Sequence, residues 1–196
     1  MSPRPRKASD EEVFAATHRV MQQVGPAQLT LGRIAAEAGV TAGALVQRFG
    51  SRRGLMLALM GEFAGSAPAM FAQIRAAHPS PLAALRAYAD CHARMGESPQ
   101  ALAHHLAYLQ IDLTDPDFHP HMHVQAVDTR RELRRLVADA VAAGELRPGT
   151  DVDVLTRAVQ AALNGSLFAW AMLREGTAAE SVRADLDAVL APYLVQ

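Results

Sequence analysis

Residues 30 to 53 hold the side chains of this chain that are best suited to chemistry on a nucleic acid. Thr41 and Gln47 carry hydroxyl and amide groups, which hydrogen-bond to base edges, and Arg52 and Arg53 carry the charge that neutralises phosphates. Such groups discriminate between DNA sequences only when an ordered element presents them together to a groove. The elements formed by the surrounding residues therefore decide whether this chemistry is available.

The surrounding residues predict two short helices joined by a tight turn. Thr30 is a good N-cap for a helix over residues 31–38, and Gly39 follows where a left-handed residue would end it. Thr41 caps a second helix, whose Leu45 points into a small core. The turn is too short for the helices to lie antiparallel, so they must cross steeply. This pattern is typical of a helix-turn-helix and makes duplex DNA the first candidate partner.

The surface that this second helix would present is short of side chains. Small residues at positions 42 to 44 cannot make the bidentate hydrogen bonds that distinguish bases, although Ala42 or Ala44 could contact a thymine methyl group. Direct readout would then depend on Thr41 and Gln47, with Arg48 or Arg33 as further candidates. Recognition of DNA shape would then contribute more to specificity than is usual.

The segment Leu29–Leu55 resembles the DNA-binding domain of the TetR family of transcriptional regulators and covers about a seventh of the chain. The residues that carry the resemblance are Thr30, Ile34, Ala35, Ala38, Gly39, Val40, Thr41, Gly43, Leu45, Phe49, Ser51, Arg52 and Leu55. The chain departs from the family at Val46, where the family usually has a tyrosine that touches a phosphate. The DNA-contacting residues expected from motif and resemblance are Thr30, Arg33, Thr41, Ala42, Gly43, Ala44, Gln47, Arg48, Arg52 and Arg53.

Charge is distributed as an oriented DNA binder requires. Residues 1–60 carry eight Lys and Arg against four Asp and Glu, giving 8 − 4 = +4, and the remainder carries eleven against sixteen, giving 11 − 16 = −5. The net charge of −1 argues against general affinity for nucleic acid. The basic arm with Arg4, Arg6 and Lys7 could enter a minor groove or follow the DNA backbone, or it could be a solubilising tail.

Composition and caps predict an all-α chain of about nine helices. Half of the residues are hydrophobic, and no apolar run reaches the roughly 18 residues of a membrane span. The single cysteine, Cys91, fits a reducing cytoplasmic setting.

We expect a DNA-binding domain over residues 1–50 and a ligand-binding and dimerisation domain over residues 51–196. The helix that Ser51 opens is expected to run to about Ala77, with residues 65–68 as the place where it could bend.

The last two helices are too broadly apolar to have one side in water, which indicates a dimer through a four-helix bundle. The alternative is that this surface is buried within one subunit. The expected dimerisation residues are Leu155, Val159, Ala162, Ser166, Trp170, Val182, Leu186, Val189 and Tyr193.

The middle helices are rich in methionine, aromatic and histidine residues that could line an adaptable cavity for a small apolar or amphipathic effector. The alternative for each residue is that it fills the core. The expected lining residues are Met60, Phe63, Met70, Tyr88, His92, Met95, His105, Tyr108, Leu109, Met122 and Phe168.

Alternating histidines at positions 119, 121 and 123 raise the question of a metal site, because imidazole suits Zn, Ni or Cu. Residues two apart on a helix point about 200° apart and cannot converge on one ion. We therefore expect His119, His121 and His123 to be surface or turn residues, with no metal or cofactor bound, and keep a metal-responsive regulator as an alternative.

An enzyme is the rival function from another class. Asp90, Cys91 and His92 are consecutive, so on a helix they point about 100° apart and form no relay. No phosphate-binding glycine loop or nucleophile elbow is present. We therefore expect a regulator without catalysis. The resemblance implies a homodimeric repressor that leaves a palindromic operator when a small molecule binds, and an architectural DNA binder without an effector is the remaining alternative.

Overall fold

Capping residues and glycines set the helix boundaries of this chain. In the computed structural model, which describes residues 8–195, Ser9 with Glu12 and Thr177 with Glu180 form the two capping boxes expected from the sequence. Gly39 ends its helix in the left-handed conformation with φ 68°, as also predicted.

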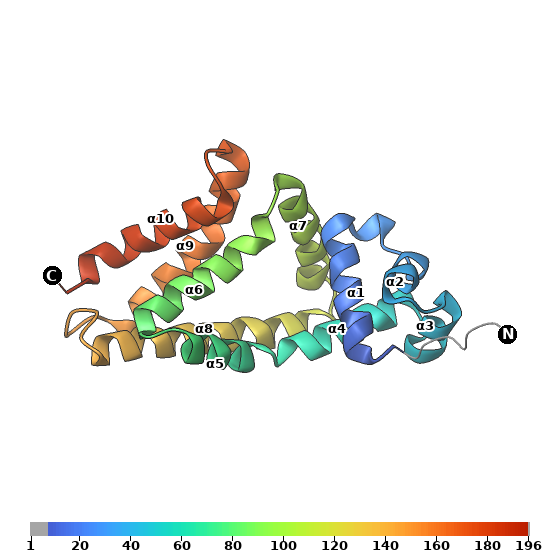
Figure 1. Cartoon of the computed structure of the whole chain (residues 1–196), viewed down its shortest axis with the longest axis horizontal. Coiled ribbons are helices and arrows are strands. Elements are labelled where there is room, and N and C mark those ends of the chain that lie inside the picture. Colours follow the sequence, from blue (N-terminus) through green and yellow to red (C-terminus); the bar gives the residue numbers. More distant parts are fainter. Residues whose placement is uncertain (1–7, 196) are drawn as a thin grey trace. The chain divides into compact units, whose positions relative to one another are not determined.

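Within the described residues the chain is all-helical, as predicted, and β pairing is limited to one antiparallel bridge between Leu146 and Leu194 (Figure 1). The α-helices are α1 (Asp10–Gln23), α2 (Leu31–Ala38), α3 (Ala42–Phe49), α4 (Arg52–Ala64), α5 (Ala67–Ala77), α6 (Pro81–Ala93), α7 (Pro99–Thr114), α8 (His119–Ala142), α9 (Val152–Leu173) and α10 (Ala178–Leu190). Short 3₁₀ turns lie at Pro26–Gln28, Arg94–Gly96 and Ala191–Tyr193.

Residues 8–195 contain ten α-helices, one more than the sequence predicted. The expected helix from Ser51 to Ala77 is two helices, α4 and α5, separated at Gly65 and Ser66. Pro68 lies in the first turn of α5, where its missing N–H leaves no intrahelical hydrogen bond unmade. The glycine and proline therefore end one helix and begin another, where a single bent helix had been expected.

The chain divides into two compact units, and the first holds the helix-turn-helix. This first unit consists of residues 1–64 and 103–122, and the second of residues 65–102 and 123–196. The first unit therefore continues past residue 50 to Ala64 and also takes in the second part of α7, the α7–α8 turn and the start of α8. Its core is formed by α1 to α4 together with Tyr108 and Phe118.

The second unit is held together by α9 against α10 and by α10 against α6. Leu155, Val159 and Leu186 are fully buried between these helices. A buried carboxylate, Glu132 on α8, accepts hydrogen bonds from Arg75 and Arg135 at 2.7 Å each, so its charge is compensated. Among the described residues no single helix is long and apolar enough to cross a membrane, and only α4 and α5 taken together meet that test of length and composition.

Candidate nucleic-acid interface

Two threonine caps orient the two helices of the helix-turn-helix. Thr30 Oγ1 accepts a hydrogen bond from the Arg33 N–H at 3.2 Å, and Thr41 Oγ1 accepts one from the Ala44 N–H at 3.1 Å. Leu45 is 1% exposed, so one side of α3 is fixed in the core and the opposite side faces solvent. The sequence therefore folds locally into a helix that presents a defined outer surface.

The outer surface of α2 and α3 contains seven of the residues expected to contact DNA. These residues are all exposed: Thr30, Arg33, Thr41, Ala42, Gly43, Ala44 and Gln47. Val46, which stands where the related family usually has tyrosine, is 47% exposed on the same helix. These residues belong to α3 and its N-cap and to the start of α2, and most of their side chains are small.

The other three expected contacts, the arginines, bind groups of the protein itself. Arg48 donates to the Ala8 carbonyl oxygen at 2.7 Å, forms an ion pair with Asp10 at 2.5 Å, and lies over the Phe49 ring. Arg52 donates to the Pro26 and Leu29 carbonyl oxygens at 2.9 Å each. These arginines therefore fix the start of α1 and the segment before α2 against α4 and against α3, which is the recognition helix of the helix-turn-helix.

Arg53 makes the most extensive of these contacts. Its guanidinium donates two hydrogen bonds to Asp115, at 2.5 and 2.8 Å, and one to Asp117 at 2.7 Å. It also lies 5.2 Å from the centre of the Phe118 ring, which is 4% exposed. The hydrogen bonds from Arg53 hold the pKa of Asp115 well below its ordinary value, at about 2. The sequence did not predict this cluster, which joins positions more than 60 residues apart.

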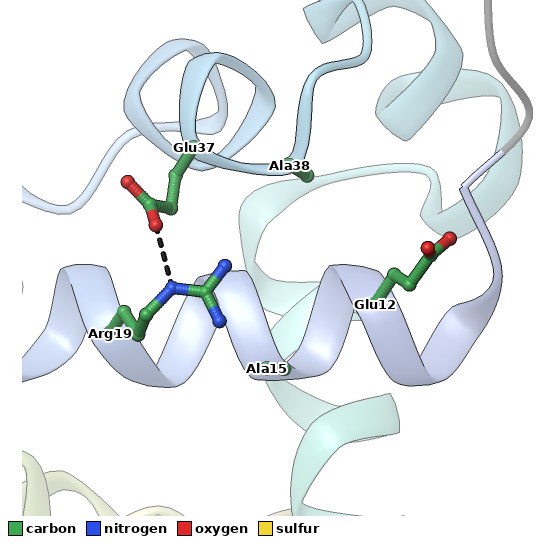
Figure 2. A pocket seen from close by; sticks show the side chains of 5 residues that line it. All are labelled: Glu12, Ala15, Arg19, Glu37 and Ala38. Atoms are coloured by element: carbon green, nitrogen blue, oxygen red, sulfur yellow. Dashed lines mark hydrogen bonds and ion pairs between the residues drawn. The ribbon is translucent and has the colours of Figure 1, made fainter.

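A shallow hollow lies on the first unit between α1 and α2, lined by Glu12, Ala15, Arg19, Glu37 and Ala38 (Figure 2). Arg19 Nε donates to Glu37 Oε1 at 2.6 Å across it, as the dashed line in Figure 2 shows. Both side chains are substantially exposed. This ion pair fastens α1 to α2, and the two alanines explain why the surface is depressed there. The basic arm with Arg4, Arg6 and Lys7 lies outside the described residues.

The residues expected to line an effector cavity are shared between the two units. Six of them belong to the first unit: Met60, Phe63, His105, Tyr108, Leu109 and Met122. Tyr108 is buried there and its hydroxyl donates to the Val24 carbonyl oxygen at 3.0 Å, so it supports the end of α1. The Phe63 ring, 47% exposed, stacks on His18. Partial desolvation of the His105 ring and the proximity of His18 lower the pKa of His105.

Five of the expected lining residues belong to the second unit: Met70, Tyr88, His92, Met95 and Phe168. Tyr88 stacks on Phe71 with ring centres 4.5 Å apart and lies 6.1 Å from the His92 ring. Burial raises the pKa of Tyr88 to about 12, so its hydroxyl stays protonated at neutral pH. Sequence reasoning did not single out Gln125, whose buried Oε1 atom makes no hydrogen bond within the described residues. Phe71 and Tyr88 supply an apolar surface within the second unit, and Gln125 on α8 supplies a hydrogen-bond acceptor in the same unit.

The structure places the expected dimerisation residues mostly inside one subunit. Six of them are at most 8% exposed: Leu155, Val159, Ser166, Trp170, Val182 and Leu186. Ala162, Val189 and Tyr193 are half-buried. The periodicity of α9 and α10 therefore reflects their packing on one another and on α6. The small or apolar residues that remain exposed on these two helices are Val154, Ala161, Gly165, Phe168, Met172 and Leu173 on α9 and Ala184 and Ala188 on α10.

The residues considered for catalysis lie on α6, and those considered for metal binding lie on α8. His119, His121 and His123 lie in the first turns of α8, and no group of three metal-ligating side chains occurs among residues 8–195. Asp90 accepts two hydrogen bonds from Arg183, at 2.5 and 2.7 Å, so its carboxylate is used to fasten α6 to α10.

Comparisons with known proteins agree with this arrangement. Residues 13–59 match the family model of bacterial regulatory proteins of the tetR family, and residues 81–186 match the model of the tetracyclin repressor-like C-terminal domain. A comparison with curated protein sequences found no match.

Solved structures of TetR-type regulators have the same fold. A TetR transcription regulator from Haloarcula marismortui is 20% identical with a TM-score of 0.72, over 95% of this chain and 98% of that one. SmeT, the repressor of the Stenotrophomonas maltophilia multidrug efflux pump SmeDEF, is 21% identical with a TM-score of 0.67, over 97% and 92%. FadR from Bacillus subtilis, in complex with stearoyl-CoA, is 16% identical with a TM-score of 0.67, over 92% and 97%.

Proposed function

Because the chain belongs to the TetR family of bacterial regulatory proteins, we propose that this transcriptional regulator represses its target genes as a homodimer until a small apolar or amphipathic effector releases it from a palindromic operator. The observation that carries the proposal is the exposed surface of α2 and α3, which is held by two threonine caps and backed by the buried Leu45. A protein of this kind works in the cytoplasm, where its DNA is.

We assign two roles to the residues near the interface. Thr30, Arg33 and the exposed residues 41–44 and 47 contact the duplex directly. Arg48, Arg52 and Arg53 act through the positions that they hold, since each already binds carbonyl or carboxylate oxygens of the protein. In a two-fold dimer the two copies of α3 would enter major grooves about one DNA turn, or a multiple of it, apart.

The dimer is proposed to form through the open faces of α9 and α10. Phe168 and Met172, four residues apart on α9, are 48% and 78% exposed, and a partner on this face would remove both side chains from water. Small residues beside them, Ala161, Gly165 and Ala184, are exposed as well and would allow close approach of a second copy. A two-fold axis through this face would make the contact self-complementary.

The effector is proposed to bind in the second unit at the Phe71–Tyr88 aromatic pair, with the buried amide oxygen of Gln125 as a candidate polar contact. Relatives with this fold include a regulator solved with stearoyl-CoA and the repressor of a multidrug efflux pump, which fits an apolar or amphipathic effector for this chain. Both α7 and α8 contribute residues to both units, and the turn between them carries the partners of Arg53. A shift of these helices when an effector binds would therefore reach Arg53 in the first turn of α4, the helix that follows α3 in the chain.

Selection from randomised duplex DNA at near-physiological salt tests this function. The proposal predicts that the retained duplexes share a palindromic motif. Retention without a motif would point to an architectural DNA binder, and no retention by protein stripped of small molecules would contradict DNA binding altogether. The selected operator then serves as a probe for effectors, because effector and operator must weaken each other's binding by the same factor.

A further inference from the structure

The arginine of this recognition helix is already bound to groups of the protein, so it is not free to contact guanine. The commonest specific contact in DNA recognition is an arginine that donates two hydrogen bonds to guanine. Arg48 is the only arginine within α3, and it is bound to the Ala8 carbonyl oxygen and the Asp10 carboxylate. Arg52 and Arg53, at the start of α4, bind backbone and carboxylate oxygens. Base discrimination by α3 must therefore use other chemistry.

The outer surface of α3 is mainly apolar. Ala42 and Val46 are both exposed and lie four residues apart, so their methyl groups form one line along the helix. Gly43 and Gln47 form the adjacent line in the same way. The thymine C5-methyl group is the one apolar group that a base presents in the major groove, and the adenine paired with it matches a glutamine amide. In an A·T pair the thymine methyl group would therefore contact Ala42 and Val46, and the adenine would hydrogen-bond to Gln47.

Gly43 supports this reading because the fold does not require a glycine there. A Cβ atom added at Gly43 would have Thr41 Oγ1, at 3.9 Å, as its nearest neighbour, which is ordinary contact. At Gly54, by contrast, an added Cβ would clash with the Phe49 carbonyl oxygen, so that glycine is needed for α4 to pack. Glycine is a weaker helix former than alanine, so Gly43 makes α3 less stable than alanine would. No contact inside the protein requires that loss of stability. The space beside Gly43 is open to an approaching base pair.

We propose that α3 reads its operator mainly through thymine methyl groups, which pack against Ala42 and Val46 while Gln47 reaches adenine across the space left by Gly43. This inference rests on the proposed function, because it assigns the chemistry by which the same DNA-binding surface recognises its target. It predicts that the base pairs contacted in each half-site are A·T pairs.

Replacement of thymine by deoxyuridine in the selected operator tests the inference directly. Deoxyuridine lacks only the C5-methyl group and keeps every hydrogen-bonding group of thymine. We expect one or two thymines in each half-site to be sensitive, each replacement weakening binding three- to tenfold, while thymines between the half-sites tolerate it. Val46→Ala should abolish sensitivity at one of these thymines, which would assign that methyl contact to Val46. Affinity within twofold of the unmodified operator after replacement of every thymine would overturn the inference.

Gly43→Ala separates folding from recognition. The variant should have a melting temperature a few degrees higher, because alanine favours the helix. It should nevertheless bind the operator at least tenfold more weakly, because the added methyl group occupies the space assigned to the base pair. Gly61→Ala on α4, where an added Cβ would lie 3.6 Å from His121 Cε1, is the matched control and should keep full operator affinity. Unchanged operator binding by Gly43→Ala would contradict close packing.

The two levels of failure can be told apart. If no duplex is selected, the proposed function fails before the inference is tested. If an operator is selected but its affinity does not depend on thymine methyl groups, the regulator remains and only this mode of readout is wrong.

Discussion

Arg53 and Asp115 are joined by two hydrogen bonds that tie the first turn of α4 to the turn between α7 and α8. Asp117 accepts a third hydrogen bond from the same guanidinium, so two carboxylates surround one positive charge. This cluster lies within the first compact unit, next to the recognition helix in sequence. It means that Arg53 adds no net positive charge where phosphates would approach.

Arg53→Ala should weaken binding to all duplexes about tenfold, because Asp115 and Asp117 would then repel phosphates without compensation. The triple variant Arg53→Ala, Asp115→Asn, Asp117→Asn should recover to within about threefold of the wild type. Titrations of fluorescent duplex over a range of salt concentrations measure both. If Arg53 contacts a phosphate instead, the triple variant will stay weak and its salt slope will fall by about one.

The Arg53–Asp115 pair should be insensitive to pH in the physiological range. The pKa of Asp115 is lowered to about 2, against an ordinary value near 3.9. The contribution of this carboxylate to stability is therefore complete above about pH 4 and is lost as the pH falls toward 2. The difference in melting temperature between wild type and Asp115→Asn should accordingly be constant from pH 5 to 8. A difference that shrinks as the pH falls from 8 to 5 would contradict the assigned pKa.

Asp112 on α7 should show the opposite behaviour. Burial raises its pKa to about 6, so the folded protein disfavours the charged form, and stability is lost as the pH rises through the interval from about 4 to 6. Asp112→Asn should be more stable than the wild type at pH 7.5, by about 1 kcal/mol after allowance for partial exposure, and equal to it near pH 4. Thermal melts at the two pH values measure this. A variant that is equally or less stable at pH 7.5 would refute it.

Tyr108→Phe tests whether α7 is part of the helix-turn-helix unit. The Tyr108 hydroxyl donates to the Val24 carbonyl oxygen at 3.0 Å at the end of α1, and its loss leaves that acceptor unsatisfied. We expect a loss of about 1–2 kcal/mol in the free energy of unfolding, measured by urea titration. Tyr193→Phe, at a half-buried position in the second unit, is the control and should cost less. Equal losses in the two variants would mean that the Tyr108–Val24 hydrogen bond makes no particular contribution to the free energy of unfolding.

Phe168→Glu should disrupt the dimer, since it places a charge on the open face of α9. We expect at least a tenfold increase in the dimer Kd, about 1.4 kcal/mol, by analytical ultracentrifugation. Leu113→Glu is the matched control, because Leu113 on α7 is 57% exposed but lies in the first unit. A Phe168→Glu protein that dimerises like the wild type, or a control that dissociates equally, would rule out this interface.

Local features of the fold were predictable from the sequence because their causes are local. Thr30, Thr41 and Gly39 cap their helices as expected, since caps depend on neighbouring residues. The break at Gly65 was placed correctly but its extent was not, because propensity alone does not decide between a bend and a new helix.

Contacts between distant residues were not predictable. No pattern in the sequence pairs Arg53 with Asp115, since a long-range ion pair leaves no periodic signal. The apolar periodicity of α9 correctly identified a face that must be covered, but it does not say by what. Leu155 and Trp170 are covered by the chain's own helices, which leaves Phe168 and Met172 for a partner. The residues of α3 that are expected to contact DNA are exposed, as that prediction requires, whereas the partners of Arg48, Arg52 and Arg53 could be found only from the fold.

Equilibrium binding to the selected operator tests the central claim most directly. Wild-type protein would be titrated into the palindromic duplex and into a scrambled duplex of the same composition at one near-physiological salt concentration. We predict two chains per palindrome and an affinity about a thousandfold or more above that for the scrambled duplex. Equal affinity for the two duplexes would contradict a sequence-specific regulator that reads DNA through α3.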